Sequence, residues 1–388
     1  KQHTFHKNYY ARNASTDGKS IVYHSGAQLY LFNIEENLSI CLYIQFNSSQ
    51  IQRSRKFITP NSYLESISMN KDASAVSIIS RGKSFAMNNW NGPAHQQGDE
   101  DGTRYQKSKF LNDGKRLVMV SDKDGSEKLE IHSVEGRKRT KVINANIGRP
   151  YEIKVSPVKD HVVLSNHKNE LLLVNLRSSK IDKIDQSKHS VIHGFNWSPD
   201  GKYIAYQCSI DARRNAIKIY DTTKKEVHTI TNPIRHDFAP VFDSKGKYLA
   251  FLSGRIYNPV YDNLHFDLGF PKGEKPYIIV LSKDMESPFF ETSPPKDKEK
   301  KDQEKDNGKS KEKKEEIKTV IDFEGIEDRV VAVPTEEGMF DGIGFSADKL
   351  FYSSYQPEGT VHDIPWYDLE PGSKSVLKCY DFNTKDEK

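Results

Sequence analysis

Cysteine is scarce in this sequence, since only Cys41, Cys208 and Cys379 occur among 388 residues. Three widely spaced thiols, odd in number, argue against a disulfide framework and against a zinc site. We therefore expect small core residues in a reducing compartment, and we predict a cytoplasmic location. No run of about 18 apolar residues occurs, so we expect no membrane span. The start, KQHTFHKNYY, is not a signal peptide and resembles a boundary cut from a longer protein.

An excess of one charge sign is also absent. The 58 Lys and Arg residues nearly balance the 54 Asp and Glu residues, which leaves a net charge of +4. A domain that binds nucleic acid usually concentrates basic residues on one face, so we predict no nucleic-acid partner. Aromatic residues are plentiful instead, and the 19 Tyr and 19 Phe suit a fold rich in β-sheet.

Catalytic and cofactor-binding motifs are missing as well. The tripeptide Gly-Lys-Ser begins at Gly18, Gly82 and Gly308, but none of these has the earlier glycine that a phosphate-binding loop requires. Residues 342–347 match a dinucleotide fingerprint loosely, yet a strand follows where a helix N-terminus is needed. Neither G-x-S-x-G nor H-E-x-x-H occurs, and nothing marks a Ser–His–Asp triad. We predict no cofactor, no metal and no catalytic residue in this chain.

What the sequence does contain is a repeated unit, written most clearly as FNWSPDGKYIAYQ over residues 195–207. Pro199, Asp200 and Gly201 favour a tight turn, because proline presets φ, aspartate bonds the backbone and glycine accepts a positive φ. An apolar and aromatic run follows at 203–206 and predicts a strand. Alternating apolar residues at 217–220 predict the next strand, half-buried.

Seven copies of this unit predict an all-β fold, a seven-bladed β-propeller with four antiparallel strands in each blade. Most copies are spaced by about 40 to 55 residues, the period of propeller blades. No amphipathic helix is evident, and a β-sandwich would not repeat one unit at this period. We therefore predict one domain over residues 1–388. The turns lie at Asp17-Gly18, Asp72, Asp113-Gly114, Lys159-Asp160, Asp200-Gly201, Lys245-Gly246 and Asp348.

Each blade also needs a fourth, outer strand. The segments at 39–46, 141–147 and 329–334 can supply it in three blades. The last blade has no obvious fourth strand, so we expect either residues 1–7 or a segment outside residues 1–388 to supply it. The tract Pro294–Lys318 is rich in Lys and Glu and predicts a disordered insertion, with a docking tail as the alternative.

Antiparallel strands predict where such a fold binds its partners. The loop that enters the first strand and the loop between the second and third strands lie at one end of a blade, and the first strand lines the channel. Binding residues are expected on these loops, including the long aromatic loop from Gly254 to Pro276. Their basic residues are either in surface salt bridges or line a site that attracts an acidic group, such as a peptide carboxylate. The candidates are Arg81, Lys83, Arg104, Arg149, His193 and His236.

Several of these segments resemble the tricorn protease family, over roughly Tyr9 to Tyr380. The resemblance lies in RGKSFAM with Trp90, in FLSGRIYNPVYD with FDLGFP, and in IDFEGIEDRVVAVP. It implies the seven-bladed propeller of a large cytosolic serine peptidase that assembles as a ring-shaped hexamer. In that family the channel is thought to admit peptides and carries positive residues, so Arg329 joins the candidates. The resemblance places the nucleophile, the catalytic histidine and the oxyanion donors in other domains.

The sequence thus predicts a propeller that gates or guides peptides to an active site in domains absent from this chain. The chain would be a fragment of a hydrolase, a serine protease, with no catalytic residue of its own. Its expected partners are peptides and the remaining domains of the same polypeptide. Two alternatives stay open: the propeller cap of a prolyl-oligopeptidase-type peptidase, and a non-enzymatic scaffold for protein interactions.

Overall fold

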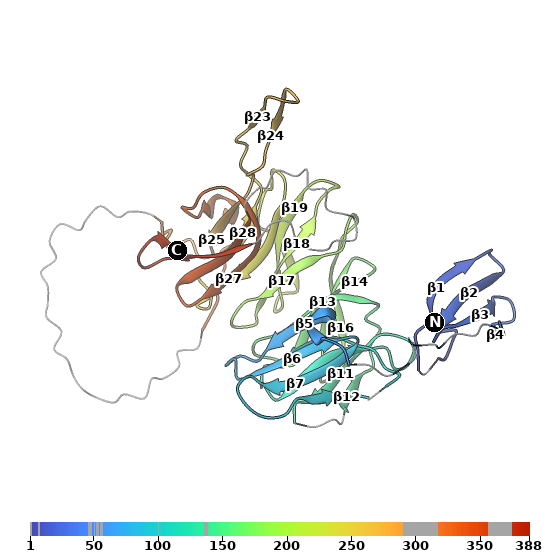
Figure 1. Ribbon diagram of the computed structural model, residues 1–388. Coiled ribbons are helices and arrows are strands. Elements are labelled where there is room, and N and C mark those ends of the chain that lie inside the picture. The colour runs from blue at the N-terminus through green and yellow to red at the C-terminus, as the bar shows by residue number, and fades with distance from the viewer. Residues whose placement is uncertain are drawn as a thin grey trace, which may run out of the picture. The chain divides into compact units, whose positions relative to one another are not determined.

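A computed structural model describes residues 2–6, 8–45, 49, 51, 54, 57–99, 101–135, 139–289, 317–355 and 375–388. Within these residues the chain forms seven four-stranded antiparallel sheets and one two-stranded sheet (Figure 1). In six of the seven four-stranded sheets the four strands are consecutive in the chain. In the sixth blade, β23 and β24 lie between the second strand, β22, and the third strand, β25. The fold is the predicted all-β propeller of seven four-stranded blades.

The first four blades contain sixteen strands. These are β1 (Arg12–Thr16), β2 (Ser20–Ser25), β3 (Gln28–Asn33), β4 (Leu38–Leu42), β5 (Leu64–Met69), β6 (Ala75–Ser80), β7 (Lys83–Asn88), β8 (His95–Gln97), β9 (Tyr105–Phe110), β10 (Arg116–Ser121), β11 (Lys128–Ser133), β12 (Arg139–Ile143), β13 (Pro150–Val155), β14 (His161–Asn166), β15 (Glu170–Asn175) and β16 (Ile181–Gln186). A short 3-10 helix, η2 (Pro60–Tyr63), precedes the second blade.

The last three blades and the two-stranded sheet contain the remaining strands. These are β17 (His193–Trp197), β18 (Tyr203–Ser209), β19 (Asn215–Asp221), β20 (Glu226–Thr229), β21 (Asp237–Phe242), β22 (Tyr248–Ser253), β23 (Val260–Asp262), β24 (Asp267–Gly269), β25 (Lys275–Val280), β26 (Val330–Ala332), β27 (Met339–Ser346), β28 (Lys349–Tyr355), β29 (Val376–Asp381) and β30 (Asp386–Glu387). The 3-10 helix η3 (Ile326–Arg329) leads into β26.

By their internal contacts the residues form two compact units. Unit 1 holds 1–155, 160–167 and 173–181, and unit 2 holds 156–159, 168–172 and 182–388. The boundary falls inside the blade of β13–β16, so this sheet contributes residues to each unit. A single domain over 1–388 therefore stays a prediction. The predicted insertion Pro294–Lys318 lies outside the described residues except for Ile317 and Lys318.

The turns that the sequence predicts between first and second strands are confirmed, and aspartate holds several of them. Asp113 Oδ1 accepts hydrogen bonds from the backbone N–H groups of Lys115 (2.8 Å) and Arg116 (3.0 Å). Asp243 Oδ1 accepts them from Lys247 (2.6 Å) and Tyr248 (2.8 Å). Each carboxylate thus satisfies backbone donors that the turn leaves without a strand partner.

The inner strands of unit 2 are apolar on both faces because each blade packs between neighbours. Four consecutive residues of β18 from Tyr203 and five of β22 from Leu249 are buried. Together with strand β19 they form one core that includes Ile219, Phe242, and Phe251. The run of buried residues, rather than strict alternation, is typical of strands covered on both sides.

Two expectations about strands need correction. The last blade does have a fourth strand within this chain, because β30 pairs with β29 through Tyr380↔Glu387 and Asp381↔Asp386. Two residues are too short a strand for pattern reasoning to find. The aromatic loop of blade six also contains regular structure, since β23 pairs with β24 through Tyr261↔Leu268. The fourth strands expected near 39–46, 141–147 and 329–334 are confirmed as β4, β12 and β26.

A partly buried polar cluster joins β16 to the middle of the next blade. Asp185 Oδ2 accepts hydrogen bonds from the Tyr206 hydroxyl and from Lys218 Nζ, both at 2.8 Å. Burial raises the pKa of Asp185, but these two hydrogen bonds outweigh it and the pKa lies below its usual value. A carboxyl group whose pKa is lowered by folding stabilises the protein at pH values above its usual pKa. This stability is lost as the pH falls through the folded pKa.

We expect Tyr206→Phe to lower the free energy of unfolding at pH 7 by about 1–3 kcal/mol, because the partly buried Asp185 carboxylate loses a donor. Denaturant titration measures this. Tyr355→Phe is the matched control, since the Tyr355 hydroxyl donates to Asp341 at 3.2 Å on the exposed surface, and it should change stability by less than about 0.5 kcal/mol. Equal effects of the two variants would show that the Asp185 cluster adds no stability.

Candidate functional site

The incoming loop of a blade and its loop between second and third strands meet at one end, as the sequence predicts. In blade three, Arg104 N–H donates to Asp122 Oδ1 at 2.7 Å. In blade four, the backbone N–H of His167 donates to the carbonyl of Arg149 at 3.0 Å. Blade six repeats the pattern with Gly254 and His236, also at 3.0 Å. Four of the seven candidate residues lie at this end in unit 1.

We call Arg81, Lys83, Arg104 and Arg149 the basic loop cluster of unit 1. Arg81 and Gly82 make the two-residue turn between β6 and β7, with φ of 50° and 71°. Positive φ at both positions is typical of the type I′ turn, one of the two common turns in hairpins of this length. A Cβ at position 82 would lie 2.9 Å from Cγ of Arg104, so only glycine lets the turn rest against that side chain. The structure therefore brings the Arg81 turn and Arg104 together.

The side chains of this cluster reach solvent to different degrees. The Arg81 guanidinium lies 5.1 Å from the centre of the Tyr63 ring. Lys83 Nζ forms an ion pair with Asp101 at 2.8 Å. The Arg149 side chain is 74% exposed, and its Nε lies 3.9 Å from Glu127 Oε1. Arg81 and Arg149 are both exposed, so an anionic group in solvent can reach their guanidinium groups.

Glu127 connects two members of the cluster. Its side chain is 18% exposed, and Oε2 is buried without a hydrogen-bond partner among the described residues. Burial raises the pKa of Glu127, while the charges of Arg149 and Arg104 act in the opposite direction and are outweighed. Burial therefore disfavours the charged form of this carboxylate.

Unit 2 has a groove of about 710 Å³ at the same end of its blades. It lies between the β18–β19 loop and the loop before β21, which meet through a bridge of Asn215 with His236. Its lining residues, which we call the basic groove, are Asp211, Ala212, Arg213, Arg214, Ile234, Arg235 and His236.

Asp211 organises one wall of the basic groove. Its Oδ1 accepts hydrogen bonds from the N–H groups of Arg213 (2.9 Å) and Arg214 (2.8 Å), and its Oδ2 pairs with Arg214 Nε at 2.7 Å. Within the part of the chain that the structure describes, no ion pair engages Arg213 or Arg235. These two exposed guanidinium groups give the groove a net positive charge that suits a carboxylate ligand.

Glu274 adds one carboxylate near the groove. Burial raises the pKa of Glu274, against the hydrogen bond from Phe340 N–H at 2.9 Å and the charges of His236 and Arg235. Glu274 thus lies near Arg235 and His236 but does not line the groove. The lining itself combines three arginines and a histidine with one acid, Asp211.

His193 and Arg329 lie apart from these clusters. His193 is exposed, begins β17 and pairs with Gln207, and it is not among the residues that line the basic groove. The Arg329 guanidinium donates to five backbone carbonyls: those of Val280 (2.9 Å), Leu281 (3.3 Å), Asp322, Glu324 (3.1 Å) and Gly325 (3.3 Å). Arg329 also precedes β26, the outer strand of its blade. These contacts indicate a structural role for Arg329, and its channel role stays a prediction.

Sequence reasoning missed Arg213, Arg214 and Arg235. The signal was present, because Arg213-Arg214 follows β18 in the loop between second and third strands and Arg235 directly precedes His236. Elsewhere in the described residues, no group of three His, Cys, Asp or Glu side chains is placed to hold a metal ion. Nor does the described part include a helix of sufficient length and apolarity to cross a membrane.

Comparison with known proteins identifies the family. The sequence model described as the tricorn protease second beta propeller domain matches residues 64–388. The chain belongs to the tricorn protease family. The resemblance that the sequence motifs indicated is thereby confirmed, and the described loops belong to a tricorn-type propeller.

Individual relatives agree with this. A tricorn-like protease C-terminal subunit of Sulfurisphaera tokodaii is 32% identical over 383 residues, covering 97% of this chain and 42% of the relative. A tricorn protease homolog of Saccharolobus solfataricus is 34% identical over 384 residues, covering 97% of this chain and 33% of the relative. The crystal structure of the tricorn protease has a TM-score of 0.72 at 21% identity, covering all of this chain and 36% of that one. This tricorn-family chain thus spans less than half the length of these relatives.

We expect Glu127→Gln to stabilise the protein at pH 7, because the raised carboxyl pKa makes the charged form costly in the folded state. For a raised pKa, stability of the native protein falls as the pH rises above the unfolded pKa. The gain should therefore vanish below about pH 4, where Glu127 of the native protein is protonated in both the folded and the unfolded state. Thermal unfolding of both proteins between pH 3.5 and 7.5 measures this. A difference that does not change with pH would contradict it.

We expect Arg329→Gln to lower the free energy of unfolding by about 2 kcal/mol or more, because several backbone carbonyls lose charged donors. Arg149→Gln is the control, since its exposed guanidinium lies 3.9 Å from its nearest acid, and it should change stability by less than about 0.5 kcal/mol. Denaturant titration of both variants provides the comparison. An Arg329→Gln protein as stable as the native one would refute the structural role.

Proposed function

We propose that this chain is the propeller of a tricorn-type serine peptidase, and that it binds and guides peptides toward an active site in domains outside this chain. The observation that carries the proposal is the concentration of exposed cations at one end of the blades. In unit 1 these are Arg81, Arg104 and Arg149, and in unit 2 they are Arg213 and Arg235. A peptide offers at least one anion, its C-terminal carboxylate, which guanidinium groups bind through paired hydrogen bonds.

The family match supports this function over both alternatives weighed from the sequence. The family and the relatives are described as those of a protease. These descriptions favour a tricorn-type arrangement over a prolyl-oligopeptidase-type cap and over a scaffold without an enzyme. The proposal also includes a cytoplasmic homo-oligomer, a hexamer, for the full-length protein, as the resemblance to the family implies.

Guidance requires binding that is neither tight nor specific to one sequence. Exposed guanidinium groups meet this requirement, because solvent-exposed ion pairs contribute about 0.2–1 kcal/mol each and are screened by salt. The open basic groove of about 710 Å³ admits an extended segment. Fixed cations around it raise the local concentration of acidic peptides.

We expect the double variant Arg213→Ala/Arg235→Ala to bind a fluorescein-labelled acidic hexapeptide about five- to thirtyfold more weakly than the native chain. Two lost ion pairs of up to about 1 kcal/mol each account for that range. Fluorescence anisotropy measures the dissociation constant, which should rise with salt concentration. The native chain should bind a peptide with an amidated C-terminus more weakly than the same peptide with a free carboxylate. The double variant should bind the two peptides with equal affinity.

Lys224→Ala is the matched control, because Lys224 is exposed in the β19–β20 turn at the opposite end of the same blade. It should bind the peptide as the native chain does. Equal affinities for the native chain and the double variant would refute binding at the basic groove. Cleavage of the peptide by the pure chain, blocked by a serine-directed inhibitor, would refute the assignment of catalysis to other domains.

A further inference from the structure

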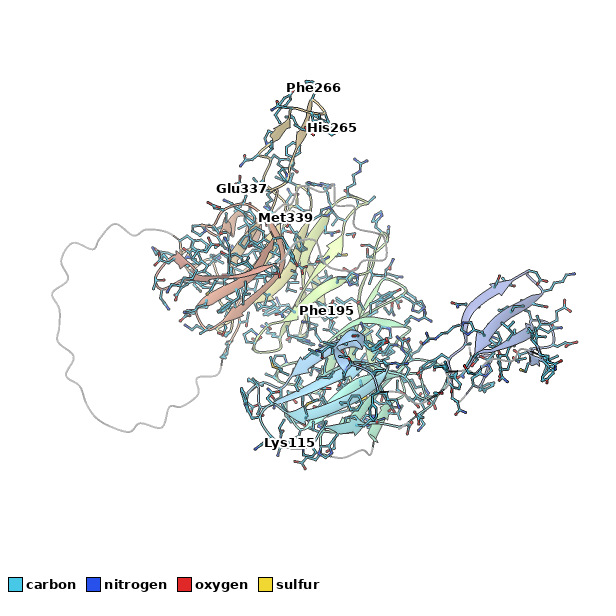
Figure 2. The ribbon with its side chains drawn as sticks, in the orientation of Figure 1. Lys115, Phe195, His265, Phe266, Glu337 and Met339 are labelled. Atoms are coloured by element: carbon cyan, nitrogen blue, oxygen red, sulfur yellow. The ribbon has the colours of Figure 1, made fainter. Side chains whose placement is uncertain are left out.

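Blade six carries a projecting hairpin, which we call the arm and define as residues 257–270. It leaves the sheet between β22 and β25 and contains β23 and β24 (Figure 1). Figure 2 shows His265 and Phe266 at its tip, away from the sheets of unit 2. Its large apolar side chains are between 46% and 79% exposed, and these are Tyr257, Val260, Tyr261, Leu264, Phe266, Leu268 and Phe270.

The arm has one apolar face and one acidic face. Tyr261 lies directly opposite Leu268, so their side chains share a face. Phe270 lies two residues beyond Leu268, and the period of two places it on that same face. The other face carries Asp262 opposite Asp267. The ribbon therefore exposes a contiguous apolar surface, and such surfaces mark sites of interaction with a partner.

The base of the arm is held firmly. Arg255 Nη2 pairs with the buried Asp237 at 2.8 Å, and its guanidinium stacks 5.4 Å from the centre of the Tyr277 ring. Asn258 donates to Glu337 at 2.5 Å, where Figure 2 shows Glu337 beside the arm's base. The exposed apolar face is therefore presented in a defined direction.

The size of the apolar face decides which occupant it suits. An aromatic side chain carries about 150–250 Å². The side chains of Tyr261, Leu268 and Phe270 on this face, and of Phe266 at the tip, are about half to three-quarters exposed. Covering them removes on the order of 400–500 Å² from water, below the roughly 800 Å² per partner of a stable free complex. Such a patch holds a partner only when a covalent connection supplies a high effective concentration.

We propose that the arm inserts its apolar face into an apolar socket on another domain of the same tricorn-type polypeptide. The matched relatives are longer than this chain, which covers 42% and 33% of two of them. A second copy is a weaker candidate, because two arms packed face to face would bury about 800–1,000 Å² in total, less than a standard interface. The socket includes an acceptor for the Tyr261 hydroxyl, since such groups are usually paired when covered.

This docking has a consequence for the neighbouring basic groove. The backbone N–H of Gly254, three residues before the arm, donates to the carbonyl of His236, which lines the groove. The socket domain would therefore stand beside the groove. The docking does not depend on peptide binding, so either proposal can fail without the other.

The test compares Leu268→Ser with the matched control Val260→Ser, an exposed apolar residue on the opposite face of the same ribbon. Each change is made in this chain and in the full-length polypeptide that contains it. In the full-length protein we expect Leu268→Ser to lower the first unfolding temperature by about 2–4 °C or more, because a covered apolar contact is lost. Val260→Ser should leave it unchanged. In this chain alone both variants should match the native protein within about 1 °C.

Hydrogen–deuterium exchange gives a second readout that does not depend on variants. Amides of residues 261–268 should exchange at least tenfold more slowly in the full-length polypeptide than in this chain. Equal exchange in the two proteins, or equal effects of the two variants in the full-length protein, would overturn the proposal. If this chain sediments as a dimer and the Leu268→Ser variant as a monomer, the proposal is overturned and the arm binds a second copy of the chain.

Discussion

The antiparallel backbone ladder within each blade is the constraint on which this protein depends. Because neighbouring strands run in opposite directions, the incoming loop and the loop between second and third strands must share one end. Aspartates fix the turns at the other end, as Asp113 and Asp243 do through paired bonds to backbone N–H groups. Residues far apart in the sequence, such as Arg213 and Arg235, therefore meet in one groove. The loops at these ends of the blades can then carry side chains that play no part in packing the sheets.

Function in this account comes from side chains added to that scaffold. The buried strands supply stability, and the cations on the loops cost little because they stay in solvent. Burial makes Glu127 unfavourable in its charged form, which is consistent with a loop end built around charge rather than around packing. The arm follows the same logic, since its base is fixed by Arg255 and Asp237 while its apolar face is free to meet another domain.

The fold could be predicted from the sequence because its turns are written locally. Pro199-Asp200-Gly201 and its weaker copies mark seven blades without reference to any distant residue. What depended on distant partners could not be predicted. The carbonyls that bind Arg329 belong partly to Val280 and Leu281, and no pattern near Arg329 in the sequence indicates these contacts. The basic groove could not be predicted without knowing that Asn215 and His236 form a bridge. The strands β23, β24 and β30 are too short for a pattern of alternation to appear.

The most direct test of the central claim is a map of where an acidic peptide touches the chain. Hydrogen–deuterium exchange of the full chain, with and without a saturating acidic peptide, reports on every backbone amide. The account predicts slower exchange in the incoming loops and second-to-third loops, at 81–83, 104–105, 148–149, 213–214 and 235–236, with no change in the turns at 113–115, 200–202 and 245–247. Protection confined to those turns, or to the outer strands, would contradict it.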